Sequence, residues 1–162
     1  MAMAADGSAE EPARANKDVV RRYYDAAWSG GDLSVVDDLV SPGYRPGGPE
    51  GEKQLIAGAR SAFPDLRYTL EDVLAAEGDT VVVRWTAQGT HRGRFRGIAP
   101  SGAEVSWSGI TIYRLAAGRL VSGWSRSQQL GLLQQLGATV VPPRGGGGAP
   151  ERPPAAAPPS GG

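Results

Sequence analysis

Hydrophobic and polar residues follow two different periods along this chain, one before Pro64 and one after it. Upstream of Pro64, apolar residues recur every three or four positions, which is the spacing of an amphipathic helix. This spacing predicts a helix over Lys17–Trp28, a short helix over 33–40 and a third over about Glu50–Ala62. We expect Gly30-Gly31 to end the first helix and Asp32 to cap the second.

Downstream of Pro64 the period falls to two, which is typical of β-strands. We expect four strands and a closing helix over the ranges Leu66–Val73, Thr80–His91, Val105–Leu115, Leu120–Gln128 and Leu130–Leu136. Turns at Gly78-Asp79 and 116–118 would join neighbouring strands as hairpins. Helices first and hairpin-linked strands afterwards predict an α+β fold, in which helices pack on a curved antiparallel sheet and enclose a cone-shaped cavity.

Alternation along each strand predicts which face meets the helices. On the 80–91 strand the apolar face holds the odd-numbered residues, from Val81 and Trp85 to His91. On the last strand Ser122, Trp124, Arg126 and Gln128 share one face, and the bulk of Trp124 predicts that this face lines the cavity. The third strand leaves both faces open, since Trp107 and Tyr113 lie on one side and Ile110, Ile112 and Arg114 lie on the other.

Composition limits the folded part to one domain. The first 15 residues show no apolar periodicity, and residues 139–162 are mostly Pro, Gly and Ala. Such segments bury too little apolar surface to offset their ordering entropy. We therefore expect a domain over residues 16–138 between two disordered tails.

Charge and residue usage exclude several classes of protein. Lys+Arg and Asp+Glu each number 17 in the 162 residues, so the net charge is zero and no global attraction to nucleic acid or anionic membrane is expected. The chain has no cysteine and one histidine, which argues against a metal site. It has no bilayer-length apolar run and no signal-peptide pattern at its start. We expect a cytoplasmic protein that uses no metal or other cofactor.

Four phrases of the sequence carry a resemblance to a known family. They are Tyr23-Tyr24-Asp25-Ala26-Ala27-Trp28 with the following Ser-Gly-Gly-Asp, Phe63-Pro64-Asp65-Leu66, the strand from Val83 to His91, and the closing Gln129–Gly137. By these four phrases the chain resembles the SnoaL-like polyketide cyclases of the nuclear transport factor 2-like superfamily. The resemblance implies a cone-shaped barrel, often a homodimer through the outer sheet face. It also implies cofactor-free ring closure in a polyketide-type natural-product intermediate, with a carboxylate on the last strand as the base.

The last strand departs from the family pattern at its acidic position. Relatives usually read Val-Glu-His-Trp and then an Asp a few residues on, whereas this chain has Ser122, Gly123 and Trp124 followed by Gln128. An amide does not titrate near neutral pH, so Gln128 cannot act as a general base. No inward-facing pair is expected among the acidic residues Asp65, Glu71, Asp72, Asp79 and Glu104.

Three side chains remain as candidates for catalysis. Arg126 and Gln128 could grip a carbonyl and stabilise developing negative charge, although Arg126 could instead form a salt bridge and Gln128 could cap the closing helix. His91 is the side chain whose ordinary pKa suits proton transfer at neutral pH, unless it holds the following loop by a hydrogen bond. The candidate substrate-binding residues are Tyr24, Trp28, Tyr44, Trp85, Trp107, Ser122 and Trp124, and core packing is the alternative for each aromatic.

These candidates support three functions. The first is a cyclase that folds a hydrophobic polyketide-like substrate and polarises a carbonyl, which suits cycloaddition or closure of an oxygen heterocycle. The second is an aldol-type cyclase with His91 as base. The third is a family member that binds a small molecule without catalysis.

Overall fold

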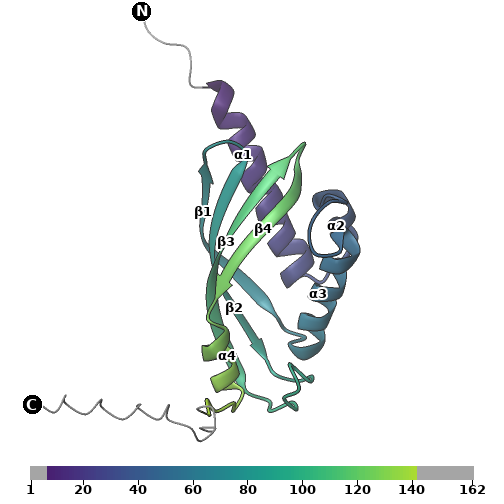
Figure 1. The fold of residues 1–162 in the computed structure, drawn as a ribbon, viewed down its shortest axis with the longest axis vertical. Helices are drawn as coiled ribbons and strands as arrows, with labels where there is room; N and C mark the ends of the chain where they lie inside the picture. The colour runs from purple at the N-terminus through teal and green to yellow at the C-terminus, as the bar shows by residue number, and fades with distance from the viewer. Residues whose placement is uncertain (1–6, 142–162) are drawn as a thin grey trace, which may run out of the picture.

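The computed structural model describes residues 7–141, and its N-terminal half is helical (Figure 1). The helical elements are α1 (Gly7–Arg22), the π-helical turn η1 (Tyr23–Ser29), α2 (Ser34–Leu39) and α3 (Gly48–Ala62). The carboxylate of Asp32 accepts hydrogen bonds from the backbone and the hydroxyl of Ser34, the first residue of α2. The N-cap position is Leu33, so Asp32 lies one residue before the cap that the sequence predicts it to form. Within the described residues, no helix is long and apolar enough to cross a membrane.

The C-terminal half forms one antiparallel sheet in sequence order. Its strands are β1 (Arg67–Ala76), β2 (Thr80–Thr90), β3 (Glu104–Ala116) and β4 (Arg119–Ser127), and α4 (Gln129–Gln135) follows. Figure 1 shows the long strands twisting together, with α1, α2 and α3 on one side of them. The predicted α+β arrangement is confirmed, including the two hairpins and the closing helix.

The core lies between the helices and one face of the sheet. The odd-numbered residues of β2 are buried, as their alternation predicts. Pairing with β2 carries the same face across β3, because Val81 lies opposite Tyr113 and Ala87 opposite Trp107. Trp107 and Tyr113 are therefore buried, whereas Ile110 is exposed on the outer face. This settles the orientation of the third strand.

The first helix begins earlier than its apolar pattern indicates. Helix α1 starts at Gly7, before the expected domain boundary at residue 16. From Glu10 to Ala15 its side chains are exposed or half-buried, so apolar periodicity is a poor guide there. Alanine and glutamate favour a helix without burial, and Asn16 donates a hydrogen bond to Asp79 in the β1–β2 turn. Residues 1–6 and 142–162, most of the two tails expected to be disordered, lie outside the described part.

Candidate functional site

A cavity of about 550 Å³ lies between the inner sheet face and the helices η1 and α3. Ten of the residues that line it are aromatic, and they come from η1, from β1, β2 and β3, and from the segments that connect these elements. The aromatic residues that line it are Tyr23, Tyr24, Trp28, Tyr44, Phe63, Tyr68, Trp85, Phe95, Trp107 and Tyr113. The predicted binding residues Tyr24, Trp28, Tyr44, Trp85 and Trp107 are all among them.

The last strand presents the opposite face from the one expected. Gly123, Ser125 and Ser127 line the cavity, whereas Ser122, Trp124 and Arg126 lie on the outer face. The register requires this, because β3 residues 113, 111 and 109, all on the inner face, lie opposite 123, 125 and 127. The prediction that the face with Ser122 and Trp124 lines the cavity is therefore wrong.

Other elements already fill the space beside β4. A side chain at Gly123 would collide with the Tyr44 hydroxyl and would lie 3.0 Å from the Tyr113 ring. Glycine is thus required at position 123 on the inner face of β4, and the bulky Trp124 faces outward, 52% exposed. Side-chain size misled the sequence interpretation because the aromatic bulk on this side of the cavity comes from Tyr44 and Tyr113.

Arg126 and Gln128, two of the predicted catalytic residues, do not line the cavity. The Arg126 guanidinium lies 4.5 Å from the centre of the Trp124 ring and donates to the Ser125 carbonyl on the exposed face. Gln128 is exposed and occupies the position that starts α4, where its backbone N–H donates to Ser108 and its carbonyl accepts from Leu132. Its side chain makes no capping hydrogen bond. The expectation that Arg126 and Gln128 face the cavity is therefore wrong, and the geometry does not favour a carbonyl grip by these two side chains.

His91 is fully buried but is not among the residues that line the cavity. Its Nδ1 lies 3.0 Å from the Ser101 hydroxyl and 3.2 Å from the Ser101 backbone nitrogen, and its own backbone pairs with Gly102 and Ala103. These contacts hold both ends of the loop that joins β2 to β3. The structural alternative for His91 therefore fits the geometry, and its assignment as a catalytic base does not.

Glu52 is the carboxylate in the cavity wall, and the sequence interpretation missed it. It lies on α3, is 5% exposed and accepts a short hydrogen bond from the Tyr23 hydroxyl. The buried indole N–H of Trp28 lies near the same hydroxyl without reaching hydrogen-bond geometry. A signal was present: Glu52, Ile56 and Ala59 follow the i, i+4, i+7 spacing of a buried helix face, so a carboxylate occupies a core position.

Burial shifts the pKa values of Glu52 and Tyr23. Desolvation raises the pKa of Glu52 above its ordinary value, and the hydrogen bond from Tyr23 opposes this increase. Desolvation and the neighbouring carboxylate raise the pKa of Tyr23 far above its usual range, so Tyr23 remains a donor. The pKa of a carboxyl group in this setting lies closer to neutral pH than the pKa of an exposed one, which suits proton transfer.

Hydroxyl groups form a second polar cluster around Thr111. The Trp85 indole N–H donates to Thr111 Oγ1 at 3.0 Å, and Thr111 Oγ1 donates to Ser125 Oγ at 3.0 Å. The Tyr24 hydroxyl lies 3.4 Å from Thr111 Oγ1 and 3.0 Å from the Tyr113 hydroxyl. Burial raises the pKa of Tyr24 to about 12 and that of Tyr113 well above its usual value. Both phenols are therefore neutral at physiological pH.

Exposed lining residues mark the mouth of the cavity. They come from α3, from the loop between β2 and β3, from β4 and from α4: Gln54, Leu55, Gly58, Arg94, Arg96, Gly123, Ser125 and Gln129. Among the described residues, Glu52, Arg94 and Arg96 are the charged members of the lining. The cavity thus has an apolar interior with one carboxylate and a cationic rim.

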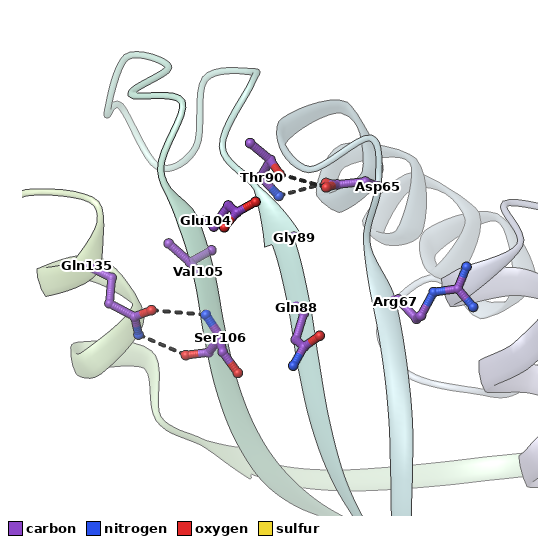
Figure 2. A pocket seen from close by; sticks show the side chains of 9 residues that line it. All are labelled: Asp65, Arg67, Gln88, Gly89, Thr90, Glu104, Val105, Ser106 and Gln135. Atoms are coloured by element: carbon purple, nitrogen blue, oxygen red, sulfur yellow. Dashed lines mark hydrogen bonds between the residues drawn. The ribbon is translucent and has the colours of Figure 1, made fainter.

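A second hollow of about 490 Å³ lies on the outer sheet face (Figure 2). In it the Gln135 amide reaches from α4 and bonds both the N–H and the carbonyl of Ser106, taking the place of a strand neighbour beyond the end of β4. Asp65 accepts hydrogen bonds from the backbone and the hydroxyl of Thr90. The Gln135 and Asp65 side chains are thus occupied by partners within the protein. The aromatic cavity, which is lined by many buried side chains, is the better candidate site.

Comparisons with known proteins agree with the geometry. The model of the SnoaL-like polyketide cyclases matches residues 18–136. TsrD from Streptomyces laurentii is 32% identical with a TM-score of 0.72, covering 78% of this chain and 97% of its own. A protein from Acidithiobacillus ferrooxidans assigned as a polyketide cyclase is 26% identical with a TM-score of 0.69, covering 84% and 97%.

AclR from Streptomyces galilaeus, assigned as a hydroxylase, is 31% identical with a TM-score of 0.67, covering 79% of this chain and 85% of its own. No curated protein matches the sequence significantly. The family match covers the helices, the sheet and the cavity between them. The chain therefore belongs to the SnoaL-like polyketide cyclase family.

Proposed function

We propose that this protein closes a ring in a polyketide-type intermediate that its cavity holds in a folded conformation. The observation that carries this proposal is an aromatic cavity of about 550 Å³ with a hydroxyl cluster in its wall. Aromatic walls favour a long unsaturated substrate, and holding its reacting ends together removes much of the entropic barrier to cyclisation. The reaction that suits the site best is one driven by substrate folding and carbonyl polarisation.

Ser125 is the group best placed to polarise a carbonyl. An indole N–H can only donate, so Thr111 Oγ1 accepts from Trp85, and its single hydrogen is directed to Ser125 Oγ. The Ser125 hydroxyl therefore accepts from Thr111, and its own hydrogen has no acceptor among the described residues. It is exposed at the cavity mouth, where a substrate oxygen can reach it. A fixed donor of this kind stabilises negative charge that develops on a carbonyl oxygen.

The test compares two serines of the same strand. A panel of linear polyketide intermediates is incubated with the protein, and cyclised isomers of equal mass are separated by chromatography. For any intermediate that is converted, Ser125→Ala should lower kcat about 100-fold, the lower end of the cost of removing one such donor. Ser122→Ala is the matched control, because Ser122 lies on the outer face. Equal rates for both variants would contradict the assigned role of Ser125.

Glu52 supports a second candidate, an aldol-type cyclisation that begins with proton abstraction. It replaces His91 in that role because its carboxylate lines the cavity, with a pKa raised by burial. Glu52→Gln keeps the shape and the acceptor for Tyr23 but cannot take a proton. Loss of turnover in Glu52→Gln, with a wild-type rate that rises with pH through the carboxyl titration, would favour this candidate. Tight binding without turnover of any intermediate would instead favour a non-catalytic binding protein.

The outer sheet face supports a homodimer. Leu74, Ile110 and Trp124 are exposed there by 57%, 44% and 52%. Three large apolar side chains on one face are typical of an interface. Light scattering should give the mass of a dimer, and Trp124→Lys should lower it to that of a monomer. An unchanged mass in this variant would contradict an interface through Trp124.

A further inference from the structure

We infer that the mouth of the cavity binds a carboxylate at one end of the ligand, through Arg94 and Arg96. This inference rests on the proposed function, since it assumes that the ligand occupies the aromatic cavity. It narrows the substrate class to acids whose apolar, unsaturated body enters the cavity while the charged end stays at the rim.

The segment that carries the two arginines is anchored at several points. The backbone N–H groups of Arg92 and Gly93 both donate to the Ala62 carbonyl at the end of α3, at 2.9 and 3.0 Å. Phe95 and Ile98 exchange both backbone hydrogen bonds, at 3.0 and 2.8 Å, which closes a tight turn. The Phe95 ring packs edge-on against Phe63, with centroids 5.2 Å apart. The arginines therefore extend from a fixed turn, which lowers the entropy lost when they bind an anion.

Each arginine is also oriented by a local contact that leaves it able to bind an anion. Arg94 Nη1 donates to the Gly97 carbonyl at 2.9 Å, and the remaining guanidinium N–H groups have no partner among the described residues. The Arg96 guanidinium lies 5.7 Å from the centre of the Phe95 ring. Neither forms an ion pair with a carboxylate of residues 7–141, whose ion pairs involve other side chains. Two cations without a counter-charge thus lie on the rim.

The charge pattern of the lining gives the ligand a direction. Arg94 and Arg96 are exposed at the mouth, whereas Glu52 is buried in the wall among tyrosines. A carboxylate would be repelled by Glu52 when that residue is ionised and attracted by the guanidinium groups, whose planar forks match carboxylate geometry. An acid is therefore oriented with its charged end at the rim and its apolar body inside.

A pair of probes that differ in charge tests this inference. Pyrenebutyric acid and its methyl ester share one apolar body, and binding can be followed by energy transfer from Trp28, Trp85 and Trp107 in the cavity wall. With the full-length wild-type protein, the acid should bind about two- to fivefold more tightly than the ester, the range expected for exposed charge pairs. About 0.5 M NaCl should abolish this preference.

Substitutions then locate the subsite. Arg94→Gln combined with Arg96→Gln should remove the preference for the acid and leave ester affinity unchanged. Arg92→Gln is the matched control, because Arg92 is exposed on the same loop but does not line the cavity. If the Arg94 change distorts the turn, ester affinity falls as well, and Arg96→Gln alone remains the test.

The outcomes separate this inference from the proposed function. Equal affinity of wild type for acid and ester would overturn the carboxylate subsite and leave the cavity proposal intact. A preference that survives in the double variant would also overturn it. Failure of both probes to bind would contradict the ligand-binding cavity itself, and the subsite with it.

Discussion

Gly109 on β3 couples the stability of the sheet to the hydroxyl cluster of the cavity. It lies opposite Trp85 on β2, and the Trp85 ring covers the position that a side chain would occupy. A Cβ at Gly109 would lie 2.8 Å from Trp85 Cη2, closer still to Cζ2, and 2.7 Å from the Arg126 carbonyl oxygen. Gly109→Ala must therefore displace the indole that donates to Thr111.

The structure sets the size of this effect. Overpacking a core by one methyl group costs about 1–3 kcal/mol, and loss of the bond between Trp85 and Thr111 costs about 0.5–1.5 kcal/mol more. Reduced entropy of the unfolded chain returns about 0.4–1 kcal/mol when glycine becomes alanine. Gly109→Ala should therefore lower the free energy of unfolding by about 2 kcal/mol.

Urea unfolding measures this change against a glycine that differs in its surroundings. Gly58 lies inside α3, and a Cβ there would meet nothing within 4 Å. Gly58→Ala should therefore raise the free energy of unfolding by up to about 1 kcal/mol, the difference in helix propensity. The same chemical change thus has opposite signs at the two positions.

A double-mutant cycle identifies the cause. Trp85→Phe removes the part of the indole that Gly109→Ala would strike, while the contact with the Arg126 carbonyl remains. The cost of Gly109→Ala should therefore fall by about 1 kcal/mol in the Trp85→Phe background, within the range for residues in contact. An equal cost in both backgrounds would refute the argument that the Trp85 ring excludes a side chain at this position.

Glu52 and Asp65 should have opposite effects on how the free energy of unfolding depends on pH. The folded-state pKa of Glu52 is raised, so above its ordinary value of 4.5 the unfolded chain releases this proton first. Wild type should then lose stability relative to Glu52→Gln as pH rises to the folded value, and a pH-independent difference in melting temperature would contradict this. Hydrogen bonds from Thr90 lower the pKa of Asp65, so this carboxylate stabilises the fold above its ordinary value of 3.8. Lowering the pH should remove that stabilisation from wild type, whereas the stability of Asp65→Asn should not show this loss. Parallel plots of melting temperature against pH for the two proteins would exclude a stabilising role for the Asp65 carboxylate.

The local pattern of the chain predicts most of the fold. Period-two alternation identifies β2 and its buried face because one side of that strand packs on helices and the other meets solvent. The order of helices and hairpins predicts the α+β architecture, since each hairpin places the next strand beside the last. The sequence predicts Tyr24, Trp28 and Trp85 as cavity residues because aromatic side chains on a buried face lie either in the core or in the wall of a cavity.

The polar part of the site could not be predicted in the same way. Glu52 follows a loop rich in Gly and Pro, and its partner Tyr23 lies 29 positions earlier in the chain. Thr111 and Ser125 meet only through the register of two strands, which side-chain type does not specify. Hydrogen bonds between distant positions depend on how the elements dock, so no local pattern reveals them.

The orientation of β4 depends partly on the sequence pattern and partly on the tertiary packing. Alternation alone determined that Ser122, Trp124 and Arg126 share one side and Gly123, Ser125 and Ser127 the other. It could not determine which side meets the cavity, because the bulk of Trp124 favours burial equally well in a core or in an interface. Tyr44 and Tyr113 decide this in three dimensions, since their side chains occupy the space beside Gly123 and leave no room there for a side chain. The aromatic cavity and its curved sheet follow from the sequence, and the hydroxyl at Ser125 follows from the packing.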